Sequence, residues 1–284
     1  MKKLFLSLLL LCCVCAICAQ PKKLSYEERK AQIKYIKNDT LPVFVTPLPD
    51  EINSKFSEYN GILFPDSSFF FTSMRYETDE DYDHIFELHW SGRIYESQWT
   101  ENGYGLSKAM DKTINHPRYF TSNFTFNHDR TLIIFSRCLK TPYQELKCQL
   151  WESRYENNEW EKPKKLGGHI NLTEYSSSQP FLVEHEDKQI LYFASNRPKG
   201  YGGMDIWYSV VQNGKYENPI NAGSYINTEG NEITPFYDKK EEILYFSSDE
   251  HLGIGGYDIF YAQGALSSFT IPTNMGVPFN SEEN

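Results

Sequence analysis

The chain has 284 residues, with 38 acidic against 28 basic side chains and a formal net charge of −10. This balance argues against a nucleic-acid-binding protein, because affinity for nucleic acid comes largely from Lys and Arg on phosphates. With 15% aromatic residues, 17 glycines and 14 prolines, the composition suits a single folded domain that buries a sizeable core.

The N-terminus has the pattern of a secretory signal peptide. Two lysines precede an apolar run from Leu4 to Cys18, and Ala19 follows it. The run is shorter than the roughly 20 residues that a membrane span needs, so we expect cleavage after residues 1–19 and no transmembrane segment in the mature protein. The sequence therefore predicts an exported protein that is periplasmic or associated with the outer membrane.

Four of the six cysteines lie inside this signal segment: Cys12, Cys13, Cys15 and Cys18. A lipid-attachment site requires a small residue directly before the cysteine, and Ile17 precedes Cys18. Release without a lipid is favoured, and a lipoprotein form stays open as the alternative.

Two segments follow the signal peptide. Residues 20–40 are predicted to form a charged tether or a short helix. Residues 41–61 resemble the end of a repeat unit, because they contain Ile52 and Asn53, a pair that recurs later in the chain.

The recurring Ile-Asn or Phe-Asn pair marks five boundaries: Ile52-Asn53, Ile114-Asn115, Ile170-Asn171, Ile226-Asn227 and Phe279-Asn280. Their intervals of 62, 56, 56 and 53 residues lie nearer to the roughly 40 to 50 residues of propeller blades than to shorter solenoid repeats. We therefore expect a propeller domain over residues 41–284, with units at about 55–115, 116–171, 172–227 and 228–280.

Each unit contains short runs with the character of β-strands. Buried strands are expected at 69–74, 132–137, 191–196 and 244–249. Each is followed by an alternating run, "HIFEL", "QLWES", "DIWYS" or "DIFYA", and in the last three units by an aromatic residue with a proline three residues later, which suits a rim strand. The expected fold is all-β: a β-propeller of four complete blades, with the N-terminal segment as an extra rim strand or a partial fifth.

A glycine-rich turn occurs twice, as "GYGGMDIWY" and "GIGGYDIFY". Its glycines are expected to provide positive φ and close backbone approach, and its aspartates to bind loop N–H groups; the residues are Gly200, Gly202, Gly203, Asp205, Gly253, Gly255, Gly256 and Asp258. A phosphate-binding loop is disfavoured, because neither the Lys-Ser/Thr pair nor a helix follows the glycines.

At these residues the sequence resembles a known family. The segments "LYFASNRPKGYGGMDIWYS" and "LYFSSDEHLGIGGYDIFYA" are similar to the TolB-type, WD-like β-propeller repeat. The resemblance is strongest to envelope proteins of the Bacteroidota, including propeller domains of peptidoglycan-associated lipoproteins linked to type IX secretion. It covers about residues 55–284, with two strong and two degraded copies, and it implies protein binding on a scaffold. Many relatives carry an OmpA-like domain that grips peptidoglycan, and no such anchoring is expected here.

Cys138 and Cys148 flank the loop of the second unit, where the glycine turn is replaced. In an oxidising periplasm two cysteines that bracket a hairpin can pair, so a disulfide is predicted, with two buried free thiols as the alternative.

The sequence contains neither of the catalytic motifs G-x-S-x-G and H-E-x-x-H, so no catalytic residue, metal ligand or cofactor is predicted. The acidic cluster Asp79, Asp81 and Asp83 lacks the glycine and glutamate of an EF-hand, so a solvated loop is favoured over a calcium site. Five loop residues are weak candidates for a partner surface: Asn196, Arg197, Asp249, Glu250 and His251.

Two functions are consistent with these observations. The favoured one is a non-enzymatic scaffold that binds envelope proteins of unknown identity in an outer-membrane or type IX secretion assembly. The alternative is a carbohydrate- or peptide-active enzyme or binding protein with a site in the propeller funnel, because side chains from different blades can converge without leaving a local motif.

Overall fold

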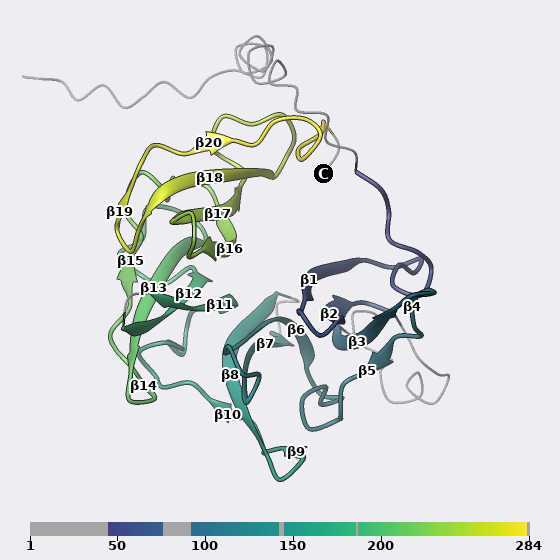
Figure 1. The fold of residues 1–284 in the computed structure, drawn as a ribbon. Helices are drawn as coiled ribbons and strands as arrows, with labels where there is room; N and C mark the ends of the chain where they lie inside the picture. Colours follow the sequence, from purple (N-terminus) through teal and green to yellow (C-terminus); the bar gives the residue numbers. More distant parts are fainter. Residues whose placement is uncertain (1–44, 76–91, 142–144, 186, 283–284) are drawn as a thin grey trace, which may run out of the picture.

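The computed structural model describes residues 45–75, 92–141, 145–185 and 187–282. In these ranges the chain is all-β and contains no helix, so none that could cross a membrane. Four antiparallel sheets surround a common axis, and the fold is a four-bladed β-propeller (Figure 1). The fold class predicted from the sequence is confirmed. The predicted signal peptide, the tether and the acidic cluster at Asp79, Asp81 and Asp83 lie outside the described residues.

Each sheet has three long strands and two short rim segments. The first contains β1 (Glu58–Leu63), β2 (Ser68–Ser73), β3 (Arg93–Thr100), β4 (Gly103–Tyr104) and β5 (Lys108–Ala109). The second contains β6 (Phe120–Phe126), β7 (Leu132–Lys140), β8 (Leu146–Glu156), β9 (Glu159–Trp160) and β10 (Lys164–Lys165). The third contains β11 (Ser177–His185), β12 (Lys188–Ser195), β13 (Asp205–Gln212), β14 (Lys215–Tyr216) and β15 (Ile220–Asn221). The fourth contains β16 (Glu232–Asp238), β17 (Ile243–Ser248), β18 (Asp258–Ala265), β19 (Ser268–Phe269) and β20 (Thr273–Asn274).

The strand order places the first strand of every sheet innermost. β1, β6, β11 and β16 lie nearest the axis, and the rim segments pair with the third strand on the outside (Figure 1). One expected strand differs: in the first sheet β2 pairs with β3, whereas "HIFEL" lies outside the described residues. The prolines expected three residues after an aromatic residue in the last three units lie beside the short rim strands. A missing N–H there interrupts no hydrogen bonds between the central strands.

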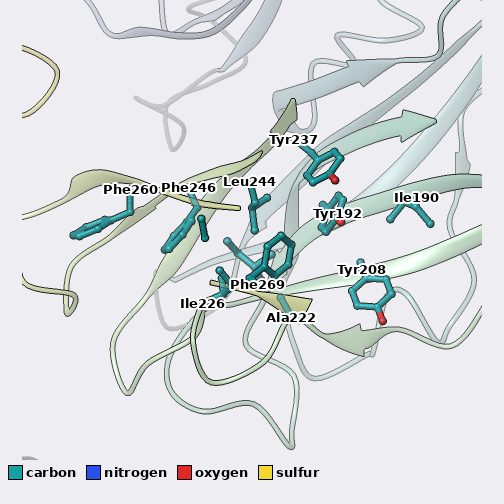
Figure 2. Close-up of a cluster of buried hydrophobic side chains, with 12 residues drawn as sticks. Ile190, Tyr192, Tyr208, Ala222, Ile226, Tyr237, Leu244, Phe246, Phe260 and Phe269 are labelled. Atoms are coloured by element: carbon teal, nitrogen blue, oxygen red, sulfur yellow. The ribbon is translucent and has the colours of Figure 1, made fainter. Parts of the chain in front are cut away.

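Apolar cores fill the spaces between neighbouring sheets. Between the third and fourth sheets, Tyr192 and Tyr208 face Tyr237, Leu244 and Phe246 (Figure 2). Equivalent cores join the first sheet to the second and the second to the third. Burial of one large apolar side chain contributes about 1.5–3 kcal/mol, so these aromatic interfaces supply much of the stabilisation of the ring.

The fourth sheet differs from the second and third because only one of its faces is covered. Leu244 and Phe246 are buried against the third sheet, whereas Ile259 and Phe279 on the other face are 36% and 46% exposed. Within the described residues, no strand of the fourth sheet packs closely on a strand of the first. The first and fourth sheets are therefore the two ends of the array.

One asparagine in each sheet fixes the third strand, which explains the recurring pair. Asn227 accepts a hydrogen bond from the Ile206 N–H at 2.7 Å and donates one to the Ile206 carbonyl at 2.9 Å. Three other asparagines hold a residue 21 positions earlier in the same way: Asn115 holds Ile94, Asn171 holds Leu150, and Asn280 holds Ile259. A side-chain amide carries one acceptor and two donors, so it can satisfy both backbone groups of one residue.

A cationic or imidazole side chain then ties each sheet to the unit before it. Arg197 is buried and donates to the carbonyls of Ile170 at 2.5 Å and His169 at 3.0 Å. Equivalent contacts join Arg75 to the Ile52 carbonyl, Arg137 to the Ile114 carbonyl, and the His251 ring to the Ile226 carbonyl. The apolar residue of the pair is thereby held by its side chain and by its backbone.

The structure joins Cys138 and Cys148 in a disulfide, the pairing indicated by the sequence. The two residues lie opposite each other on β7 and β8, ten positions apart in the chain.

Replacing both cysteines by serine is expected to lower the free energy of unfolding by about 2–3 kcal/mol, because a short closed loop restricts the unfolded chain. Urea denaturation of oxidised protein measures the change. Reduction of the unsubstituted protein is the control and should give a similar loss. Equal stability of the serine variant and the oxidised protein would contradict the prediction.

Candidate functional site

The four innermost strands share an irregularity at the axis. Each has a β-bulge, and a polar residue with positive φ occupies it: Asn60, Asn123, Gln179 and Thr234. Positive φ is uncommon for residues other than glycine, and bulges redirect side chains next to binding sites. The repeat thus places four equivalent uncharged polar residues around the axis.

The bulges also connect neighbouring sheets. The Asn60 amide oxygen accepts a hydrogen bond from the Phe124 N–H at 2.6 Å, and the Gln179 amide oxygen accepts one from the Thr234 N–H at 3.3 Å. These bonds fix the orientation of both amides. The NH₂ groups of Asn60 and Gln179 make no hydrogen bond within the part of the chain that the structure describes, so they are available as donors.

A cavity of about 520 Å³ opens at these residues. Aromatic rings from all four innermost regions line it: Phe64, Phe126, Phe181 and Phe236, the last of them 51% exposed. Phe181 and Phe236 lie with their centroids 4.8 Å apart. None of the described residues that line this cavity is charged. We call it the axial funnel.

A second cavity of about 580 Å³ adjoins the funnel and carries the charged groups. Asp66 forms an ion pair with Arg130, and Glu184 lies 3.9 Å from Lys239. Hydrogen bonds from Ser68 and Arg130 lower the pKa of Asp66 to about 2. Asp66 is therefore ionised at neutral pH, unlike a general acid, which needs a raised pKa.

In the glycine-rich turn the aspartates make the predicted hydrogen bonds, but glycine is required there for close packing and not for positive φ. Asp205 accepts hydrogen bonds from the N–H groups of Tyr201 at 2.7 Å and Gly202 at 3.1 Å. In the second turn, Asp258 accepts hydrogen bonds from backbone N–H groups in the same way. Among the described residues, positive φ occurs at other glycines, so that part of the expectation is wrong. A Cβ at Gly202 would overlap the backbone of Thr228 and Glu229 in the loop before the fourth sheet. Close approach between sheets therefore requires glycine here.

The residues considered for a partner surface are largely engaged in the fold. Arg197 is buried beneath the rings of Phe193 and Trp207, so its assignment to an exposed surface is corrected. Asn196 accepts a hydrogen bond from the Ser176 N–H, and the carboxylate of Asp249 binds Asn231. His251 holds the Ile226 carbonyl, and the Glu250 N–H donates to Ser248. They connect elements of the ring.

Sequence reasoning did not identify the funnel residues. A signal exists, because Gln179-Pro-Phe181 and Thr234-Pro-Phe236 repeat the same polar-Pro-Phe order 55 residues apart. The first two units replace the proline, and only the fold shows that all four segments meet at one axis. Among the described residues, no group of three or more His, Cys, Asp or Glu side chains is arranged to hold a metal.

No family model matches this sequence, and no curated protein is similar to it. Solved structures are similar in fold. An α-L-arabinofuranosidase of Fusarium graminearum in complex with arabinobiose superimposes with a TM-score of 0.46 and 14% identity, over 76% of this chain and 65% of that one. A Penicillium chrysogenum α-L-arabinanase gives 0.45 and 12%, over 75% and 65%. A protein of unknown function from Dyadobacter fermentans gives 0.49 and 7%, over 78% and 65%.

The chain thus spans 65% of the length of these proteins, and at such identity the likeness shows the fold alone. The expectation that the protein is not an enzyme is corrected, because it was based only on the absence of a catalytic motif; the solved propellers of similar fold include glycoside hydrolases. The absence of a catalytic motif was weak evidence. Propeller sites gather single residues from separate blades, which no local pattern reveals.

Proposed function

We propose that the protein binds a neutral carbohydrate in the axial funnel. The observation that carries this proposal is the composition of the funnel: amide and hydroxyl groups on four bulges, aromatic rings beside them, and no charged residue among its described lining. Ligand sites combine apolar walls with a few oriented polar groups, and this cavity has both.

The chemistry of a sugar matches these groups. Its hydroxyls accept hydrogen bonds from amide NH₂ groups such as those of Asn60 and Gln179, and its C–H faces pack on exposed aromatic rings such as Phe236. A charged ligand would lose its hydration without gaining an ion pair in this part of the cavity. The uncharged lining therefore favours a neutral ligand.

Substitution of funnel residues tests the proposal. Phe236→Ala and Gln179→Ala are each expected to weaken binding of neutral oligosaccharides about tenfold, which corresponds to about 1.4 kcal/mol. Isothermal titration with a panel that includes arabinobiose measures the affinity. Leu106→Ala, at an exposed residue outside the described funnel lining, is the control and should bind normally. Absence of binding to every neutral glycan, or equal affinity in all variants, would refute the proposal.

The same samples measure hydrolysis. Glycoside hydrolysis uses two carboxyl groups that flank the bond. Chromatography of the glycans after incubation detects cleavage, and loss of cleavage in an Asp66→Asn or Glu184→Gln variant would assign a catalytic part to the neighbouring cavity.

The cellular location belongs to the proposal as well. The signal-peptide pattern of residues 1–19 and the resemblance to TolB-type repeats of Bacteroidota envelope proteins support a periplasmic or outer-membrane-associated protein with an envelope protein as partner. Fractionation and cross-linking in the native cell test this, and a cytoplasmic protein with an uncleaved N-terminus would contradict it.

A further inference from the structure

The second, charged cavity lies at the end of the axis where four hairpin turns meet. Each sheet contributes a charged residue to its lining, on or next to the turn between the first and second strands: Asp66, Arg130, Glu184 and Lys239. Three residues line this cavity and the axial funnel alike: Phe64, Phe126 and Leu182. The charged cavity is therefore continuous with the funnel, and we call it the funnel mouth.

Arg130 is the charged group of the mouth whose position is best fixed. Its Nη1 donates to the Ser68 Oγ at 2.7 Å, and its Nη2 donates to the Asp66 carboxylate. The guanidinium lies over the ring of Phe64, 4.9 Å from the centroid. The side chain nevertheless stays 35% exposed in the wall of the cavity. A ligand in the mouth thus meets an arginine that is already oriented.

The backbone around Arg130 does not itself call for an arginine. Arg130 has a φ of 57°, a conformation that is uncommon outside glycine and in which Asn and Asp are enriched. The equivalent position of the first hairpin turn is occupied by Ser67, with a φ of 67°. The Asn127 side chain holds the turn, because its Oδ1 accepts a hydrogen bond from the Leu132 N–H at 2.8 Å. The role of Arg130 must therefore lie in its side chain.

The fixed groups of the mouth offer more hydrogen-bond donors than acceptors. A guanidinium has five N–H groups, and within the described residues Arg130 uses two of them. Asp66 already accepts three hydrogen bonds, two from Ser68 and one from Arg130. Lys239 lies 3.9 Å from Glu184 and is more than half exposed, so it can turn toward a ligand. Unused N–H groups of a planar guanidinium match the two oxygens of a carboxylate.

We propose that the funnel mouth binds a carboxylate, and that the ligand is an acidic oligosaccharide. Its uronic-acid residue binds Arg130, and the neutral sugar next to it occupies the axial funnel. This inference rests on the proposed function, because the neutral sugar is the one placed in the funnel. The shared lining allows one glycan to extend through both cavities. Because Asp66 and Glu184 each have a cationic neighbour, the mouth does not repel an anion strongly.

Isothermal titration with a matched pair of ligands tests this. The probes are a disaccharide of glucuronic acid and xylose and its methyl ester, in which the carboxylate charge is removed. The acid is expected to bind at least about tenfold more tightly than the ester. Arg130→Met should reduce this ratio to about one, and Arg118→Met, at an exposed residue outside the lining, is the matched control and should preserve it. Because each ratio is measured within one variant, a general loss of folded protein does not change it.

Three results would overturn the proposal. The first is equal affinity of the unsubstituted protein for the acid and the ester, and the second is a ratio that Arg130→Met leaves unchanged. The third is tighter binding of a disaccharide of glucosamine and xylose than of the acid, which would make Glu184 the selective group.

Arabinobiose separates this inference from the proposed function. If arabinobiose binds and Phe236→Ala weakens it, while the acid and the ester bind equally, the funnel binds a sugar and only the acidic class is wrong. If none of these glycans binds, both proposals are wrong.

Discussion

Asn227→Ala is expected to lower the free energy of unfolding by about 3 kcal/mol. The amide binds the N–H and the carbonyl of Ile206, both inside the ring, and Ala leaves these groups unsatisfied. Each unsatisfied buried polar group costs about 1–3 kcal/mol. Urea denaturation followed by tryptophan fluorescence measures the change.

The control for this prediction is Asn218→Ala, at an exposed position on the rim of the same sheet, where a change below about 0.5 kcal/mol is expected. Asn227→Asp separates the two hydrogen bonds, because a carboxylate keeps the acceptor and loses the donor. A loss below 1 kcal/mol for Asn227→Ala would show that the recurring asparagine does not stabilise the third strand.

Arg197→Met is expected to cost a similar amount, about 3 kcal/mol. Met retains apolar contact with Phe193 and Trp207 but cannot donate to the carbonyls of His169 and Ile170. Hydrogen bonds from a charged donor are worth about 1.5–3 kcal/mol. Burial lowers the pKa of Arg197 to about 10, so the side chain stays charged at neutral pH. Thermal unfolding checks the loss.

Arg197→Lys keeps the charge and one donor, so it should lose less stability than Arg197→Met. Arg118→Met, at an exposed position, is the matched control. If Arg197→Met were as stable as the control, the arginine would have no part in joining the second and third sheets.

The repeat itself could be predicted from the sequence because its signals are local. The Ile-Asn pair recurs at nearly constant intervals, and the aromatic runs before each turn are too short for helices. The role of Asn227 was not predictable, because its partner Ile206 lies 21 residues away on another strand. Spacing along the chain identified the residue, and only the fold identified its contact.

The turn glycines show that a residue type alone does not reveal which structural requirement it meets. Both positive φ and close approach favour glycine, and the sequence does not distinguish them. The backbone of Thr228 and Glu229, which belongs to the next unit, decides the matter for Gly202. The sequence likewise does not reveal the environment of Arg197. It reads as an exposed loop residue, but it is buried and donates hydrogen bonds to two carbonyl groups of the preceding unit.

The funnel was the part least accessible from the sequence. Gln179 and Thr234 share a following Pro-Phe pair that Asn60 and Asn123 lack, and all four residues become equivalent only as the bulges of the innermost strands. The uncharged lining of the funnel arises only when the four sheets are assembled, because each sheet contributes a part of it. A search for catalytic or metal-binding motifs therefore passed over them.

A crystal structure of the protein without residues 1–19, soaked with a neutral oligosaccharide, tests the central claim most directly. The account predicts a sugar ring at the axis, packed on Phe236 and within hydrogen-bond distance of the Gln179 amide. A sugar bound only at the outer rim of the sheets, or a funnel that stays free of sugar at saturating concentration, would contradict it.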